Sequence, residues 1–185
     1  IFLITLIIQN RVFSEEAGSY YNRLKELTAE KKFRPALELS AKAMNEYPAE
    51  QGFVVYSIWC SNELKQFGEA IALGRKALKK WPDSTHIKEN YSWSLVLYAQ
   101  DIIENKKSID PLPFAREGFK LNPNESSMLW LAISLRHNGN LDDAIDLFKE
   151  GAEKYPGNKY FSLNLLYIHT ERGREAREKN NRKYA

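Results

Sequence analysis

The 185-residue sequence is poor in the residues that build metal sites, disulfides and most catalytic motifs. It has one cysteine, Cys60, and therefore neither an internal disulfide nor a Cys-rich zinc site. The three histidines lie far apart, at His86, His137 and His169, with no HExxH motif and no Cys/His cluster. A GxSxG motif, a Gly-rich phosphate loop and a Ser/His/Asp arrangement are also missing. We therefore expect no metal, no cofactor and no enzymatic activity.

The sequence also has little glycine and proline. Nine glycines and seven prolines exclude a collagen-like or low-complexity chain. Apolar residues make up 43%, which is enough to fill a core and too many for a disordered chain. The length suits one domain or one short repeat array.

Positive charge is in excess only near the C-terminal end. The chain has 27 Lys and Arg against 24 Asp and Glu, a net charge of +3. Residues 171–185 hold six Lys or Arg and three Glu, so the whole excess lies there. A nucleic-acid binder usually carries a basic stripe over its fold, and this body is neutral. We expect no nucleic-acid partner, and a basic polar capping helix or tail over 171–185.

The N-terminal segment has the character of a targeting sequence. Ile1–Ile8 is apolar apart from Thr5. It is shorter than the ~20 residues of a membrane span but matches a signal-peptide apolar region of ~7–15 residues. Cleavage after Ser14 would make residues 1–14 a signal-peptide remnant of a periplasmic or secreted protein. The alternatives are the end of an upstream membrane anchor, or a first helix packed on the fold of a cytoplasmic or membrane-anchored protein. Membrane contact is expected only through this segment, if it is retained.

A 34-residue internal repeat is the strongest pattern in the chain. Like residues recur at this spacing at Phe33 and Phe67, Ala36 and Ala70, Leu39 and Leu73, Ala43 and Ala77, and Pro48 and Pro82. A third copy spans 140–156, and a weaker one ends at Asn122-Pro123. Apolar residues at three-and-four spacing, separated by proline-bearing loops, predict pairs of helices. The interval from Pro82 to Pro123 is seven residues too long, which predicts that one first helix gains about two turns.

These residues resemble the tetratricopeptide repeat, a 34-residue helix–turn–helix unit. The match is strongest at Met128, Leu131, Ala132, Leu135, Gly139, Leu141, Ala144, Phe148, Gly151 and Pro156. The resemblance covers about 17–170. It implies an all-α fold, a right-handed superhelical solenoid of stacked helix-turn-helix repeats, with about four and a half repeats over 15–170.

If that geometry holds, the first helix of each pair lines a concave groove. Aligning the repeats places seven candidate partner-binding residues there: Tyr21, Lys25, Trp59, Asn62, Trp93, Arg136 and Tyr167. Trp59 and Trp93 are expected to be neighbours, and Asn62 and Arg136 to form polar edges. Aromatic side chains of this kind suit a peptide or an amphipathic helix. The alternatives are that these aromatic side chains belong to the core, or that residues 1–14 fill the groove.

The sequence therefore predicts a non-enzymatic adaptor that binds a protein or peptide partner, in the cell envelope. Two other roles remain open at this stage. The chain could be a tetratricopeptide segment of a larger enzyme or envelope assembly, or a cytosolic secretion chaperone.

Overall fold

The computed structural model describes the backbone of residues 2–183 and the side chains of residues 15–174, 177 and 178. Within that range it contains nine α-helices and no strand, so the all-α prediction is confirmed. The helices divide into two compact units, Ile1–Ser94 and Leu95–Ala185. Each unit has its own apolar core.

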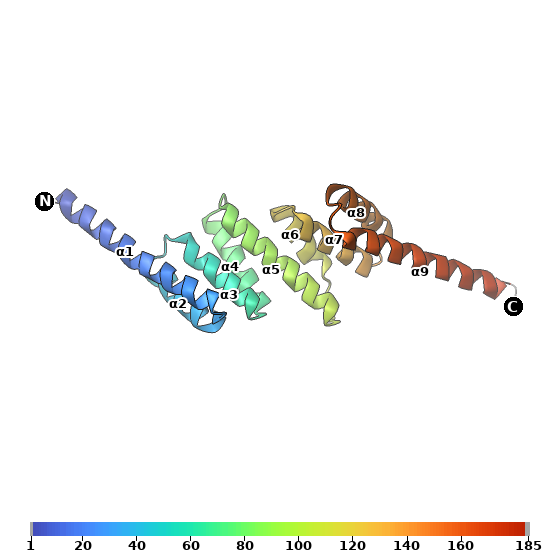
Figure 1. Cartoon of the computed structure of the whole chain (residues 1–185), viewed down its shortest axis with the longest axis horizontal. Coiled ribbons are helices and arrows are strands. Elements are labelled where there is room, and N and C mark those ends of the chain that lie inside the picture. The colour runs from blue at the N-terminus through green and yellow to red at the C-terminus, as the bar shows by residue number, and fades with distance from the viewer. Residues whose placement is uncertain (1, 184–185) are drawn as a thin grey trace. The chain divides into compact units, whose positions relative to one another are not determined.

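The first unit contains α1 (Phe2–Ala29), α2 (Phe33–Glu46), α3 (Gln51–Glu63), α4 (Phe67–Lys80) and the start of α5 (Thr85–Glu104). Consecutive helices form hairpins, as Figure 1 shows, and α1 also packs on α3. Contact between helices that are not consecutive is typical of a solenoid, in which each hairpin stacks on the next.

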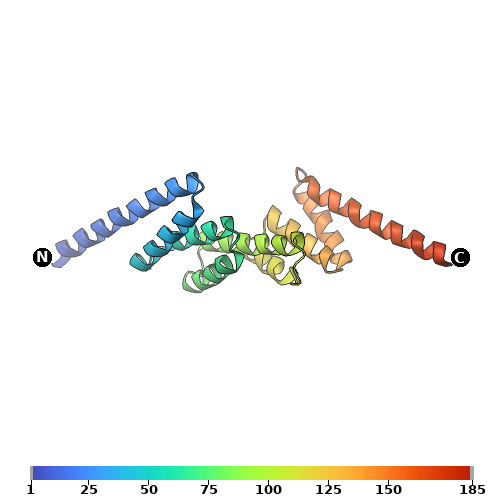
Figure 2. The same ribbon diagram turned by 90° about the horizontal axis from the view of Figure 1, so that it is seen from below.

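The second unit contains the rest of α5, then α6 (Leu112–Leu121), α7 (Glu125–His137), α8 (Leu141–Lys154) and α9 (Lys159–Lys183). The contacts follow the same plan: α7 packs on α6 and α8, and α9 packs on both α8 and α7. The C-terminal part of α9 continues past the end of α8 (Figure 2).

The turn inside each hairpin has one residue in the left-handed region. These residues are Lys31, Lys65, Lys106 and Gly139, with φ of 56°, 58°, 50° and 79°. In each turn the next amide donates to a carbonyl five residues earlier, as from Gln66 to Ser61 at 2.8 Å. This is the Schellman ending of a helix, which normally favours glycine at the left-handed position. Only the fourth turn has glycine at this position, Gly139, so the other three turns cannot be recognised from a glycine in the sequence.

The second helix of each hairpin ends before a proline. The last helical turn closes at Tyr47, Trp81 and Tyr155, each followed by proline. Helix α7 then opens with a capping box, in which the Asn124 side chain accepts from the Ser127 amide. The aromatic-Pro pairs of the 34-residue repeat are thus helix ends.

Helix α5 accounts for the irregular interval in the repeat. It has 20 residues, whereas α3 and α7 have 13 each. The seven additional residues agree with the seven-residue surplus between Pro82 and Pro123, so the predicted lengthening is confirmed. The following loop, residues 105–110, is fully exposed.

Helix α1 runs without a break from Phe2, and its N-terminal half projects beyond α2 (Figure 1 and Figure 2). The side chains of residues 1–14 lie outside the described part of the chain, so their assignment to a signal peptide or anchor stays a prediction. Among the described residues, no helix combines the length and the apolar character that crossing a membrane requires. The predicted capping helix over 171–185 falls within α9 as far as Lys183.

Glycine allows close helix approach where a large ring lies across the helix. A Cβ placed at Gly74 in α4 would lie 2.6 Å from the Cδ2 atom of Tyr91 in α5 and 2.8 Å from its Cβ. A Cβ placed at Gly151 in α8 would likewise lie 2.1 Å from the Cε1 atom of Phe161 in α9. Both rings are fully buried and cannot move aside cheaply.

We predict that Gly74→Ala lowers the free energy of unfolding by about 1–3 kcal/mol, because the added methyl group overpacks a buried crossing. Gly68→Ala in the same helix is the matched control, since nothing lies within 4 Å of its Cβ position. That variant should be neutral or more stable by up to about 1 kcal/mol. Urea unfolding followed by circular dichroism measures both. Equal stability of the two variants would contradict the packing argument.

Candidate partner-binding surfaces

A row of aromatic side chains lies across α1 and α3 in the first unit. Tyr21 stacks on Phe53, with ring centroids 4.3 Å apart and planes 18° apart. Tyr56 continues the row at 6.2 Å from Tyr21, and Trp59 follows at 6.1 Å from Tyr56. Burial and the Glu50 carboxylate raise the pKa of Tyr21 above its usual value. Phe53 is fully buried, whereas Tyr21, Tyr56 and Trp59 are half-buried, so the row combines a fixed geometry with an accessible edge.

Trp59 is held on both sides. Its indole Nε1 donates to Glu63 Oε1 at 3.2 Å, and its ring meets Phe33 edge-on at 6.2 Å. Trp93, on α5, is 43% exposed. The expectation that the two tryptophans are neighbours on one wall stays a prediction.

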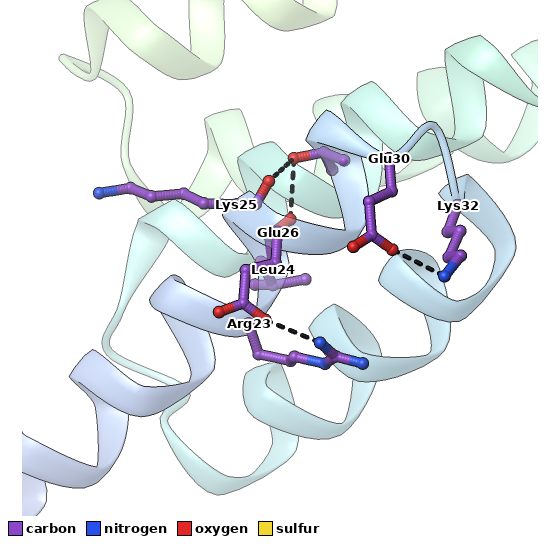
Figure 3. Close-up of polar contacts among 7 residues, drawn as sticks. Arg23, Leu24, Lys25, Glu26, Glu30 and Lys32 are labelled. Carbon is purple, nitrogen blue, oxygen red and sulfur yellow. Dashed lines mark hydrogen bonds and ion pairs between the residues drawn. The ribbon is translucent and has the colours of Figure 1, made fainter.

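Lys25 is the free cation beside this row. Figure 3 shows its side chain reaching away from α1, whereas Arg23 pairs with Glu26 at 2.7 Å and Glu30 pairs with Lys32 at 2.7 Å. No carboxylate among the described residues pairs with Lys25, which remains available to a partner.

Asn62 lies elsewhere than expected. It was predicted at a polar edge, but it is only 4% exposed, and neither its amide oxygen nor its amide nitrogen has a hydrogen-bond partner. The hydroxyl of the neighbouring Ser61 is also buried and has no hydrogen-bond partner. Because both polar ends are sealed from solvent, a partner cannot reach Asn62 without movement of its surroundings.

Helix α9 carries a group of exposed large apolar side chains in the second unit. Phe161, Leu165 and Ile168 turn into the core. On another face of the helix, four large side chains are 49–63% exposed: Tyr160, Leu163, Leu166 and Tyr167. Their three-and-four spacing makes one continuous stripe, which we call the α9 stripe. Isolated exposed apolar residues are ordinary, whereas a contiguous group marks an interaction surface.

Arg136 of α7 lies at the border of the α9 stripe. Its guanidinium donates to Asn164 Oδ1 at 2.7 Å and lies 4.8 Å from the centroid of the Tyr167 ring. Tyr167 in turn donates to Glu171 Oε1 at 2.8 Å, and this hydrogen bond raises the pKa of the phenol. No described carboxylate pairs with Arg136. The half-buried cation is therefore oriented by neutral groups and keeps donors for an incoming acceptor.

Among the described residues, no cluster of three or more His, Cys, Asp or Glu side chains could hold a metal ion. The one thiol lies in the core. Cys60 is fully buried, and burial, followed by the Glu63 carboxylate, raises its pKa to about 11. A nucleophilic cysteine needs the opposite, an exposed thiol with a lowered pKa.

Residues 126–158 match the family model described as tetratricopeptide repeat. This segment of the chain is a tetratricopeptide repeat. The matched span is the segment in which the sequence resemblance was strongest, and the solenoid fold that the resemblance implied is confirmed.

Solved structures agree with this fold over most of the chain. MamA from Desulfovibrio magneticus RS-1 (residues 41 to the end) is 13% identical, with a TM-score of 0.68 over 85% of each chain. MamA AMB-1 is 15% identical with a TM-score of 0.64, over 89% of this chain and 86% of that one. YrrB, described as a TPR protein with an unusual peptide-binding site, is 17% identical with a TM-score of 0.60, over 86% and 84%. No curated protein sequence matches. At these identities the likeness shows the fold alone.

Of the seven predicted site residues, the structure exposes Lys25, Trp93 and Tyr167, half-buries Tyr21, Trp59 and Arg136, and buries Asn62. It brings Arg136 against Tyr167, and Tyr56 links Tyr21 to Trp59. Tyr160 and Leu166 were missed. The sequence pattern that pointed to them is a helix with apolar residues on two faces, although packing against the core of the second unit needs only one.

We predict that Cys60 in the native protein resists iodoacetamide at pH 8 and reacts fully in urea. Its folded pKa of about 11 lies above the ordinary value of 9.0. The resulting contribution to stability is therefore present below pH ~9 and is lost as the pH rises toward 11. Mass spectrometry of the labelled protein measures the first effect, and urea unfolding at several pH values measures the second, with Cys60→Ala as the blank. Rapid native labelling would show that the thiol is accessible.

Proposed function

We propose that this chain is a non-enzymatic scaffold that binds a segment of a partner protein on the first helices of its repeats. The observation that carries this proposal is the α9 stripe beside Arg136, which has no carboxylate partner. Tyrosine and arginine are frequent in binding hot spots. Tyrosine gives a large contact area with few rotatable bonds, and arginine carries several hydrogen-bond donors in a fixed geometry.

An amphipathic helix or an extended peptide fits this surface best. The stripe offers apolar contact along about two turns of α9, which suits side chains spaced at three and four. Arg136 supplies the polar group that fixes orientation, by donating to a partner carboxylate or carbonyl. Asn164 and the Tyr167 ring already hold it in place, so little conformational entropy remains to be lost.

The aromatic row of the first unit is proposed as a second contact surface of the same kind. Tyr21 stacks on Phe53, Trp59 is held by Phe33 and Glu63, and Lys25 and Trp93 are exposed. YrrB, which shares the fold, is described as having a peptide-binding site. That analogy supports a binding role without naming the partner.

We also propose that the scaffold works in the cell envelope, with residues 1–14 as its targeting segment. The support is the apolar run Ile1–Ile8. Cell fractionation with N-terminal sequencing of the mature chain tests this. A chain recovered in the envelope and beginning at Glu15 is expected, and an uncleaved chain in the cytosol would contradict the proposal.

For the binding role, we predict that the double variant Leu163→Asp plus Tyr167→Asp loses at least about tenfold in affinity, which corresponds to about 1.4 kcal/mol. The partner is first identified by affinity capture and mass spectrometry. It is then purified and titrated against each variant by calorimetry.

Lys149→Asp is the matched control, because it makes the same change of two charges at an exposed residue of α8, outside the α9 stripe. This control should bind as wild type does. Circular dichroism confirms that both variants are folded. Undiminished binding by the stripe variant would refute the assignment of this surface.

A further inference from the structure

The first unit contains a cavity that none of the surfaces above uses. It has a volume of about 370 Å³, within the range of small-ligand pockets. It lies between the second helices α2 and α4, with α3 below. Its lining residues are Met44, Asn45, Tyr47, Pro48, Glu50, Val54, Leu73, Lys76, Ala77, Lys80 and Trp81.

The cavity is apolar at its base. Val54 and Ala77 are buried, and Met44, Leu73 and Trp81 are half-buried around them. These side chains also belong to the core that joins α3, α4 and the start of α5. The base is therefore a fixed part of the fold, and it presents carbon atoms to whatever enters.

The rim is basic along α4. Lys76 and Lys80 are exposed and four residues apart, so they share one face of the helix. No described carboxylate pairs with either. Glu50 is the one acidic residue in the lining, and it interacts with the Tyr21 phenol. The charge that faces an incoming group is therefore mainly positive.

Lys80 lies across the edge of the cavity. Its Nζ donates to the Pro48 carbonyl oxygen and lies 4.5 Å from the centroid of the Trp81 ring. Both contacts are exposed and depend on a long flexible side chain. An anion at the rim would compete for this ammonium group and would release the Pro48 carbonyl to accept an amide N–H.

We propose that this cavity binds an acidic peptide segment. The segment inserts one aromatic or long aliphatic side chain between α2 and α4 and places flanking carboxylates against Lys76 and Lys80. The released Pro48 carbonyl accepts a backbone amide of the peptide. Charge complementarity favours an acidic occupant, and the apolar base requires that the occupant also carry a large apolar group. The site uses second helices and so does not depend on the proposed function.

The probe is a synthetic peptide, blocked at both ends, with one phenylalanine between two pairs of aspartates. Binding to the full chain is followed by ¹H–¹⁵N NMR, with the Trp81 indole signal as the local reporter. We expect this signal and the amides around Pro48 and Leu73 to shift on titration. Replacing phenylalanine by alanine, or the aspartates by lysines, should abolish the shifts.

Variants then distinguish a specific binding site from general attraction between opposite charges. Lys76→Glu and Lys80→Glu should each weaken peptide binding about tenfold, because each replaces an attraction by a repulsion. Lys79→Glu is the matched control: it makes the same change of charge on the same helix at a residue that does not line the cavity. It should change the affinity less than about twofold, since exposed charges away from the contact act weakly.

Three results would overturn the proposal. These are no shift of the Trp81 indole at millimolar peptide, equal binding of the alanine peptide, or equal weakening by Lys79→Glu and Lys80→Glu. All three lysines are exposed, and a urea midpoint near that of wild type confirms folding. The variant Leu163→Asp plus Tyr167→Asp should bind this peptide normally, so failure here and failure of the proposed function are distinguishable.

Discussion

The structure depends on close packing between helices that cannot bury their own apolar faces. A single hairpin leaves one side of its apolar stripe open, and only the next hairpin can cover it. Coverage requires that backbones approach closely enough for a large ring to lie across a helix. Gly74 beneath Tyr91 and Gly151 beneath Phe161 meet that requirement, each with the ring fully buried. These two close contacts allow neighbouring helices to pack and to cover each other's apolar faces.

The same packing bears on the proposed α9 surface. In α9, Phe161 and Ile168 face the core, where the helix contacts α7 and α8, while Leu163 and Tyr167 face solvent. One apolar face of α9 is thus covered by its neighbours and the other is exposed. We infer that a partner segment with apolar side chains at helical spacing would cover the exposed face in the way that a neighbouring helix covers the other.

The sequence alone predicted much of the fold, because the 34-residue spacing of proline and small residues reflects helix ends and crossings directly. It also predicted the long α5, since a seven-residue surplus keeps the same helix face buried. It did not predict the left-handed turn residues, because Lys31, Lys65 and Lys106 occupy a position where glycine is the usual marker. For the candidate site, it selected Arg136 and Tyr167, which the structure brings together, and it expected Asn62 at a polar edge, where the structure buries it. An alignment error of one residue turns a side chain by about 100° around the helix axis, which moves it from the surface to the interior.

Polar side chains in the core explain a further part of that error. Seven serines of the described part of the chain are buried: Ser40, Ser57, Ser61, Ser92, Ser94, Ser127 and Ser134. A serine hydroxyl can bond to a carbonyl of its own helix, as Ser94 does to Asn90 at 3.0 Å and Ser134 to Trp130 at 2.7 Å. Once its hydroxyl is satisfied in this way, serine packs as a small residue and costs little to bury. A serine in the sequence therefore does not by itself predict an exposed position.

Ser61 and Asn62 are the exceptions to this rule, because the Ser61 hydroxyl and the Asn62 side-chain amide have no hydrogen-bond partner. An unsatisfied buried group costs about 1–3 kcal/mol, so the end of α3 is held in place against a local penalty. The adjacent turn adds the strain of Lys65 at φ 58°. Packing from α2 and α4 on either side of α3 must offset both terms. The conformation at the junction of α3 and α4 thus depends on its neighbours.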